Sequence, residues 1–239
     1  MKILFNAHIH TFDRRQPKAS AILINRDRIV SIGHGELLDS FPTINREDMD
    51  GRVILPGLTD AHIHLMHYAL GLQKVDVETK TKAEALKRVA ERAAKTAPGQ
   101  WILGHGWQQN DWPPSSAGAP AGQFPTAADL DAIATDKPIY LTAKSLHAGW
   151  ANTTALRIAG IGPGTPDPHN GKIVRDEHGQ PNGILLETAM SLLEEKLPQP
   201  TVGEVAEAIA AAQPILFGMG LTGAHDFDYR PCFMALQQL

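Results

Sequence analysis

The residues of this 239-residue sequence whose types and spacing could do chemistry are histidines. The tetrapeptide Ala-His-Ile-His occurs at residues 7–10 and again at residues 61–64, so each copy holds two histidines separated by one residue. In a β-strand such residues share a face and lie about 6.6–6.8 Å apart. Two imidazoles placed in this way can converge on one ion, with Zn–N distances of about 2.0–2.1 Å. The spacing therefore predicts a metal site, which either copy could supply.

The second copy follows an uninterrupted apolar run, Val-Ile-Leu at residues 53–55, and a Pro-Gly turn. Such a run suits a strand that is buried on both faces, and the histidines stand where that strand would end. In a β/α barrel the C-terminal ends of the strands carry the active site. We therefore predict that His62 and His64 are metal ligands, with Asp60 as an acceptor for a ring N–H of the pair.

The first copy stands near the N-terminus, between Asn6 and Thr11. Its surroundings are typical of the polar face of a half-exposed strand. We predict that His8 and His10 are surface histidines with ordinary hydrogen bonds rather than metal ligands.

Composition excludes several classes of protein. The net charge is −4, with 22 basic and 26 acidic residues and no basic cluster, which argues against a nucleic-acid partner. The single cysteine, Cys232, allows no internal disulfide and no cysteine-based zinc site. No apolar run approaches the roughly 18 residues that a membrane helix needs. With 43% hydrophobic and 20% charged residues, the sequence predicts a cytoplasmic globular protein with no membrane partner.

Two regions differ in their hydrophobic patterning. Residues 1–53 hold short β-branched runs separated by Asn/Asp and Gly turns, which predict a small β module. From residue 54 onward, strands alternate with helices, and this order favours parallel βα units of the α/β class. Capping boxes predict helices that begin near residues 81–84 and 201–204. Two strands flanking a turn predict an excursion hairpin near residues 171–187.

Several stretches together resemble a known family. They resemble amidohydrolase family 3, a branch of the amidohydrolase superfamily that includes N-substituted formamide deformylases and predicted metal-dependent hydrolases. The stretches that carry the resemblance are VILPGLTDAHIHL at 53–65, WILGHGW at 101–107 with NDW at 110–112, YLT at 140–142 with His147 and WAN at 150–152, GILLE at 183–187 and GLTGAHD at 220–226.

The resemblance implies a two-part architecture. A small β-sandwich would be built from both chain ends, with a metallo-dependent hydrolase (β/α)8 barrel between them. Residues 1–53 would form the N-terminal part of the composite β-sandwich, and residues 54–239 the N-terminal part of a TIM-type barrel that is incomplete in this chain. The resemblance also implies one or two divalent ions, Zn²⁺ or another metal. Their further ligands would be a lysine or glutamate, two more histidines and an aspartate from later strands.

Length limits what this sequence can supply. A barrel of about 250 residues that begins near residue 54 cannot close by Leu239. We therefore expect a fragmentary record, a truncated coding sequence, or a missing C-terminal segment supplied by a separate chain. The catalytic aspartate that the resemblance implies is expected beyond residue 239. Because two histidines alone hold a catalytic zinc poorly, we expect weak zinc binding and no measurable hydrolase activity from these 239 residues alone.

The leading hypothesis is a metal-dependent hydrolase that cleaves non-peptide C–N bonds of amide or formamide type in a small molecule by means of metal-activated water. The alternative is a non-catalytic truncated fragment that folds or forms a homo-oligomer and binds a ligand or partner without turnover. An open half-barrel would expose strand edges and apolar faces, which favour association. A histidine-rich metal-buffering protein is a third reading, but the histidines are spread along the chain rather than clustered.

Other residues could contribute to a substrate pocket. Trp107, His147 and His225 are the candidates, the first two by family-like position and the third at the end of a buried-looking strand. The alternatives are that Trp107 belongs to the core and that His147 makes structural hydrogen bonds. Glu187 follows an apolar strand and could be a metal ligand or a salt-bridging residue. Asp226 could stand at the pocket edge or cap the next segment.

Overall fold

The computed structural model describes residues 1–114 and 122–239, and these fall into two compact units. The first unit comprises Met1–Ile63 and Pro214–Asp226. The second unit comprises His64–Gln213 and Phe227–Leu239. A search of the described residues finds no helix with the length and apolar character needed to cross a membrane.

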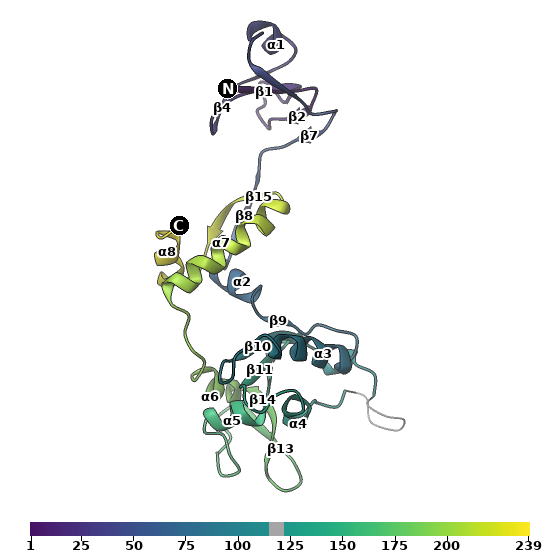
Figure 1. Cartoon of the computed structure of the whole chain (residues 1–239), viewed down its shortest axis with the longest axis vertical. Helices are drawn as coiled ribbons and strands as arrows, with labels where there is room; N and C mark the ends of the chain where they lie inside the picture. Colours follow the sequence, from purple (N-terminus) through teal and green to yellow (C-terminus); the bar gives the residue numbers. More distant parts are fainter. Residues whose placement is uncertain (115–121) are drawn as a thin grey trace. The chain divides into compact units, whose positions relative to one another are not determined.

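The first unit is built mainly of strands, arranged in three sheets (Figure 1). Four strands pair in the order β5-β4-β1-β6, three in the order β3-β2-β7, and two as β15-β8. The elements are β1 Lys2–Phe5, β2 His8–His10, β3 Lys18–Ala19, β4 Ala21–Asn25, β5 Arg28–Gly33, α1 Glu36–Ser40, β6 Asn45–Asp48, β7 Val53–Ile54, β8 Leu58–Ile63 and β15 Leu221–Asp226.

Strand β4 explains how the N-terminal sheets hold together. Its side chains alternate between two faces, as they must in a strand. Leu23 packs on one face with Ile3 and Leu37 of α1. Ile22 packs on the other face with Ile9 of β2. Both faces of β4 are therefore buried, and an apolar cluster joins the four-stranded sheet to the three-stranded sheet.

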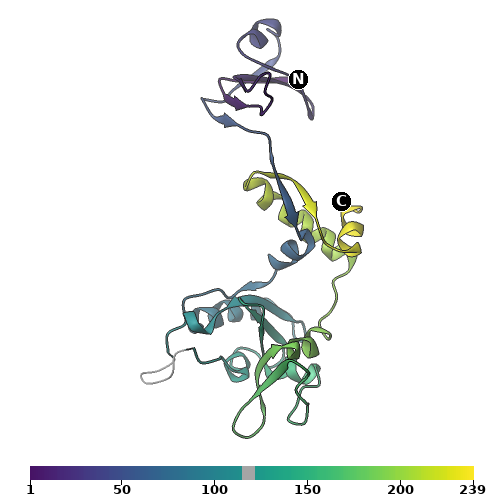
Figure 2. The same cartoon turned by 180° about the vertical axis from the view of Figure 1, so that it is seen from behind.

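Strands β8 and β15 form a parallel pair, although more than 150 residues separate them in sequence. They lie side by side in both views, as dark blue and yellow arrows (Figures 1 and 2). Leu221 pairs with Leu58 at one end, and Asp226 pairs with Ile63 at the other. Close approach explains Gly57, because a Cβ there would lie 1.9 Å from the Thr222 hydroxyl oxygen.

The second unit is organised around a six-stranded sheet in the order β13-β14-β12-β11-β10-β9. Its strands are β9 Val75–Asp76, β10 Ile102–Trp107, β11 Ile139–Ala143, β12 Ala148–Ala151, β13 Gly171–Arg175 and β14 Pro181–Glu187. Its helices are α2 Leu65–Gly71, α3 Lys82–Ala93, α4 Ala127–Asp131, α5 Thr153–Ile158, α6 Ser191–Glu194 and α8 Arg230–Leu236, with short 3₁₀ helices at Gln109–Asp111 and Thr188–Met190. Helix α7 Val202–Gly218 begins in this unit.

Both faces of the six-stranded sheet are buried. The run at residues 53–55, for which burial on both faces is expected, is instead exposed, at 61% for Val53 and 51% for Leu55. On β11, Leu141 packs on one face in a cluster with Trp107 and Trp150. Tyr140 packs on the opposite face with Leu185 and Leu193. The sheet thus separates two apolar clusters.

Local signals in the sequence specify several of these elements. The helix predicted at residues 81–84 is confirmed as α3, and the Thr81 hydroxyl accepts the Glu84 backbone N–H at 3.2 Å. The helix predicted at 201–204 is confirmed as α7. There the Thr201 N–H donates to the Glu204 carboxylate at 2.7 Å. Strands β13 and β14 pair antiparallel in the stretch where a hairpin is expected.

Strand direction departs from the expectation of parallel βα units. The parallel pattern holds for β9, β10 and β11 and for β8 with β15. Strands β12, β14 and β13 are antiparallel instead. Only residues 144–147 join β11 to β12, whereas a parallel crossover needs about a dozen residues or more. The sheets of the described residues are therefore mixed, and none of them closes into a barrel.

Candidate metal centre

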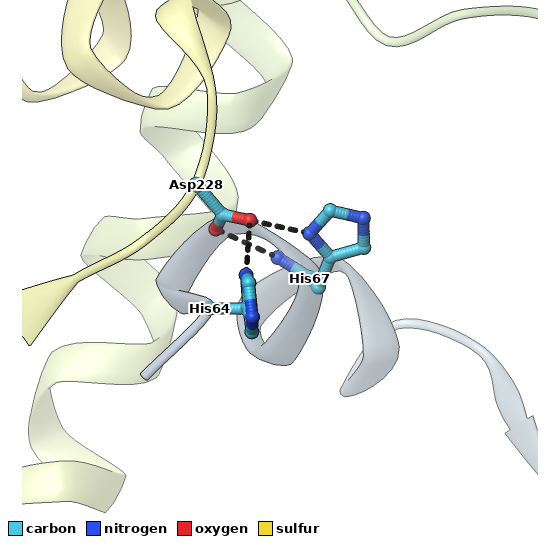
Figure 3. A group of neighbouring side chains, drawn as sticks. All are labelled: His64, His67 and Asp228. Carbon is cyan, nitrogen blue, oxygen red and sulfur yellow. Dashed lines mark hydrogen bonds and ion pairs between the residues drawn. The ribbon is translucent and has the colours of Figure 1, made fainter. Parts of the chain in front are cut away.

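Two histidines at the start of α2, one of them its N-cap residue, and one aspartate form a cluster of potential metal ligands (Figure 3). His64 Nδ1 lies 3.2 Å from Asp228 Oδ1, and His67 Nδ1 lies 2.5 Å from the same oxygen. The two imidazole rings meet nearly edge to face, with centroids 5.8 Å apart. One ligand atom from each of the three residues lies within 4.8 Å of the others. Two nitrogens and one oxygen thus converge from two separate segments of the chain.

Helix α2 is what brings the two histidines together. His64 is its N-cap residue and His67 lies three residues further on, a spacing that puts side chains on one helix face. The N-cap side chain makes no capping hydrogen bond to the helix. Asp228 takes that role, because its Oδ2 accepts the Met66 backbone N–H at 2.6 Å. The carboxylate therefore caps the helix with one oxygen and faces both imidazoles with the other.

The environment of Asp228 favours its ionised form. Its side chain is fully buried, whereas the side chains of His64 and His67 are 51% and 64% exposed. Burial by itself raises the pKa of this carboxyl, but hydrogen bonds from His67, the Met66 N–H and His64 outweigh it and hold the pKa below its usual value. A buried anion beside two accessible imidazoles is a suitable donor set for a cation.

The parallel pairing of β8 and β15 explains how residues 164 positions apart reach each other. Both strands end at the same edge, with Asp226 opposite Ile63. The chain then continues from β8 into α2 and from β15 through residues 227–229 into α8. Asp228 lies in that second connection and His64 in the first. Because the two strands end at the same edge, these two residues come within hydrogen-bond distance.

The structure places the two predicted ligands in different settings. His62 lies within β8, and its backbone N–H donates to Asp60 Oδ1 at 2.9 Å. His64 lies beyond the strand end, because α2 begins at the next residue. The structure brings His64 together with His67 and Asp228, and His62 is not one of those three. Metal ligation by His62 and His64, and acceptance of a ring N–H by Asp60, stay predictions.

Trp107 is fully buried at the end of β10. Its indole N–H donates to the Leu141 carbonyl at 2.9 Å, and its ring packs against Trp112, Phe124 and Trp150. This environment corresponds to the core alternative, and a pocket role for Trp107 stays a prediction.

The remaining candidates lie at strand ends. His147 precedes β12, and its Nδ1 lies 2.9 Å from Glu187 Oε2 at the end of β14. His225 lies in β15 and is exposed. Substrate contact by either histidine stays a prediction.

His67 and Asp228 are the two cluster residues that the sequence predictions lack. A signal for His67 existed, since a helix beginning at residue 65 aligns positions 64 and 67. A weaker signal marked Asp228, which follows a strand predicted to end at residues 225–226, where barrel enzymes place functional groups. Neither signal tells which side chains meet, because that depends on the pairing of β8 with β15.

A cavity of about 590 Å³ lies beside the cluster within the second unit. This volume falls in the range of small-molecule pockets, about 300–1,000 Å³. His67 and Leu70 of α2 contribute to its wall. The other main lining residues are Trp101, Leu103, Tyr140, Thr142 and Glu194. Burial raises the pKa of the Tyr140 hydroxyl, which stays protonated and donates to Glu194 at 3.0 Å. The cavity thus combines apolar walls with a few fixed polar groups.

Comparison with known proteins identifies relatives in bacteria, archaea and plants. The chain is 31% identical over 227 residues to Protein LONG AFTER FAR-RED 3 of Arabidopsis thaliana, covering 94% of this chain and 38% of that protein. It is 34% identical over 196 residues to an N-substituted formamide deformylase of Arthrobacter pascens, covering 80% of this chain and 35% of that protein. The chain therefore spans about two fifths of the length of these curated relatives.

Solved structures agree with the sequence comparisons. A crystal structure of an uncharacterized metal-dependent hydrolase from Pyrococcus horikoshii OT3 superposes with a TM-score of 0.71 and 25% identity, covering 100% of this chain and 45% of that one. The sequence profile of the Amidohydrolase family matches residues 47–237, which is most of the chain. The chain therefore belongs to the Amidohydrolase family.

Proposed function

We propose that this chain carries a divalent-metal centre of a hydrolase that cleaves amide- or formamide-type C–N bonds in a small molecule. The observation that carries the proposal is the convergence of His64 and His67 on the buried carboxylate of Asp228. Family membership and the metal-dependent hydrolase with a similar fold support the reaction class. The similarity to an N-substituted formamide deformylase supports the bond type.

The donor set fits a divalent transition metal. Catalytic zinc sites commonly use three protein ligands, drawn from histidine nitrogens and carboxylate oxygens. His64, His67 and Asp228 offer such a set, with ligand atoms within 4.8 Å of one another. His62, predicted from its spacing to His64, is the candidate for a further ligand. We propose zinc as the ion, because two imidazoles and one carboxylate match its preferred donors.

The protein groups have separate tasks in this proposal. A divalent ion, when bound, polarises a scissile carbonyl and makes a water molecule more acidic. Asp228 keeps its orientation because α2 donates the Met66 N–H to its second oxygen. The cavity beside His67 holds the substrate against Trp101 and Leu103, whose apolar surfaces exclude water.

Metal binding tests this centre without requiring turnover. Isothermal titration of the chelator-treated protein with Zn²⁺ should give one site per chain, and Co²⁺ should give the visible absorption of a site with nitrogen and oxygen ligands. His64→Gln should weaken binding at this site by at least about 100-fold, whereas His178→Gln, a change at an exposed histidine of the β13–β14 turn, should leave it intact. Equal binding by both variants would contradict the proposal.

Hydrolysis is tested separately, with amine release from a panel of simple amides and N-substituted formamides. We expect no rapid release by these 239 residues alone, because they span only about two fifths of the length of the curated relatives. Slow release that a chelator abolishes would support the metal-dependent reaction. Rapid release that persists with chelator present would contradict it.

Association without turnover is the second candidate function, and one observation favours it. Helix α8 exposes a set of large apolar side chains, at Phe233, Met234 and Leu236. Exposed apolar surface of this kind is typical of interfaces. Light scattering should then give a mass above that of one chain, and Phe233→Ser should restore the monomer mass of 25.9 kDa. A monomeric wild-type protein would remove this candidate.

A further inference from the structure

His147 and Glu187 form a hydrogen-bonded pair at one end of the six-stranded sheet. His147 Nδ1 lies 2.9 Å from Glu187 Oε2. The backbones are bonded as well, since the Glu187 N–H donates to the His147 carbonyl at 3.0 Å. The two residues thus extend the β12–β14 ladder by one position, beyond the pairing of Ala148 with Leu186. Directly opposed residues of neighbouring strands hold their side chains close together.

The backbone of Glu187 supports a specific role for this side chain. Its φ is +52° and its ψ is −128°, a conformation that residues with a Cβ rarely adopt. Such conformations cost free energy and persist where the surrounding structure holds them, often at functional sites. Here the strand ends and the chain turns into the 3₁₀ helix Thr188–Met190. The turn directs the carboxylate of Glu187 to His147.

The register of the sheet relates this pair to the cavity. Thr142 lines the cavity, and it lies opposite Gly149 of β12, which lies opposite Leu185 of β14. His147 and Glu187 stand two residues further along the same two strands, and therefore on the same face. Two residues of strand span about 6.6–6.8 Å. The pair consequently lies at the edge of the sheet face that bears the cavity.

The pair is also at the carboxyl edge of the sheet. Strands β9, β10 and β11 run parallel, and β14, which is antiparallel to β12, runs in their direction. Glu187 is the last residue of β14, and His147 precedes β12 at the same edge. In α/β sheets, ligands bind outside the carboxyl ends of the strands.

Hydrogen bonding fixes which nitrogen of His147 is available. An ionised carboxylate only accepts hydrogen bonds, so the proton of a neutral His147 must reside on Nδ1. Nε2 then carries a lone pair and can accept a hydrogen bond from an N–H or O–H group. The His147 side chain is 69% exposed, so a small molecule can reach this nitrogen.

We propose that His147 is a substrate-binding residue that accepts the N–H of an amide through Nε2, and that Glu187 is its positioning residue. The substrate class rests on the proposed function, but the hydrogen-bonded state of His147 requires neither metal nor turnover. The cavity that contains Thr142 and Tyr140 would hold the apolar part of the molecule. Its amide would then lie at the carboxyl edge beside His147.

The positioning role is tested by the side-chain nitrogen spectrum of the ¹⁵N-labelled chain at neutral pH. His147 is assigned from the signals that disappear in His147→Gln. We expect a protonated Nδ1 and a bare Nε2 in the wild type. Glu187→Ala should shift His147 toward the Nε2–H form that free histidine prefers in water, and Glu187→Asp should restore much of the wild-type pattern. A wild-type Nε2–H form, or no change in Glu187→Ala, would overturn the positioning role.

The matched control is Glu177→Ala, in the turn between β13 and β14. Glu177 stands next to His178, whose Nε2 lies 3.5 Å from its carboxylate, and both side chains are highly exposed. This variant removes the same charge from the same hairpin, but beside His178 instead of His147. We expect unchanged His147 signals, and the backbone amide spectrum should remain that of the folded chain in each variant.

The substrate contact is tested with benzamide, which combines an apolar ring with an amide N–H. Benzamide should move the Nε2 signal of His147, and its affinity should fall about 5- to 10-fold in His147→Leu and in Glu187→Ala but not in Glu177→Ala, the fall expected for one lost hydrogen bond. Absence of binding, or binding that leaves His147 Nε2 unmoved, would overturn the contact. Benzamide binding is measured on metal-free protein. The result for His147 therefore does not depend on whether the proposed metal centre exists.

Discussion

The same tetrapeptide, Ala-His-Ile-His, occupies two different environments in this molecule. In the first copy, Ala7, just before strand β2, and Ile9, within it, are both in the core, with 5% and 4% of their surface exposed. In the second copy, Ala61 is exposed and Ile63 only half-buried, and the last histidine starts a helix. Within the described part of the chain, the second copy alone contributes a histidine to a cluster with a buried aspartate. The comparison teaches that the tetrapeptide alone does not define a site: only its last histidine, His64, joins a cluster with a carboxylate that is distant in sequence.

The largest expected effect concerns how much each copy contributes to the free energy of unfolding. Ile9→Ala should lower the free energy of unfolding by about 3 kcal/mol, because it empties a packed position of the core. Ile63→Ala should cost about 1 kcal/mol, because that side chain is only half-buried. Urea unfolding followed by circular dichroism measures both. Equal costs would mean that the two copies are equally embedded.

Metal affinity should separate the copies in the opposite sense. His64→Gln should weaken Zn²⁺ binding by at least about 100-fold, because loss of a group that only orients a ligand already costs about 10- to 100-fold. His10→Gln should leave the affinity within about twofold, because no potential ligand group in the described part of the chain includes His10. Titration calorimetry of the two variants, prepared side by side, gives the ratio. A comparable loss of affinity in His10→Gln would mean that the metal binds at the first copy.

His67 lies on α2, three residues after the second copy ends, and belongs to the same cluster as His64. His67→Gln should weaken Zn²⁺ binding by about 10-fold, since His64 and Asp228 remain. Stability should change by less than about 0.5 kcal/mol, because the side chain is 64% exposed. Calorimetry and urea unfolding on one preparation measure both quantities. An unaltered affinity would exclude His67 from the centre.

Substitutions at Asp228, the carboxylate beside the second copy, separate its role as a helix cap from its role as a potential metal ligand. Asp228→Ala should destabilise the protein by about 1 kcal/mol, because α2 loses the acceptor of its Met66 N–H. Asp228→Asn should cost only a few tenths of a kcal/mol, because the amide oxygen can still accept that bond. Hydrogen exchange at residues 66 and 67 reports the cap directly. Equal exchange in the two variants would show that the cap is dispensable.

Much of the fold was predictable from local patterns. The Thr81–Glu84 and Thr201–Glu204 boxes mark helices because the hydroxyl and carboxylate satisfy backbone groups within one turn. The pairing of β12 with β14 and β11 was not predicted as antiparallel. Strand direction there follows from the short connection at residues 144–147 and from packing, which a periodicity pattern does not record.

The candidate site was predictable only in part. His64 was identified because its spacing to His62 and its place after an apolar strand are properties of one short segment. His67 and Asp228 were not identified. Their relevance depends on α2 beginning at Leu65 and on β15 pairing with β8, and these are contacts between distant segments.

The sequence by itself determined the family, the two helix caps and the two-residue spacing of the histidines in each Ala-His-Ile-His copy. Each of these follows from chemistry within a few residues, or from the fixed two-residue period of a strand. Tertiary structure decided which Ala-His-Ile-His copy lies beside a buried carboxylate. It also decided which nitrogen of His147 faces the Glu187 carboxylate. The reason is physical: a hydrogen bond acts over about 3 Å. Partners 164 and 40 residues apart in sequence come within that distance only when the strands between them pair in register.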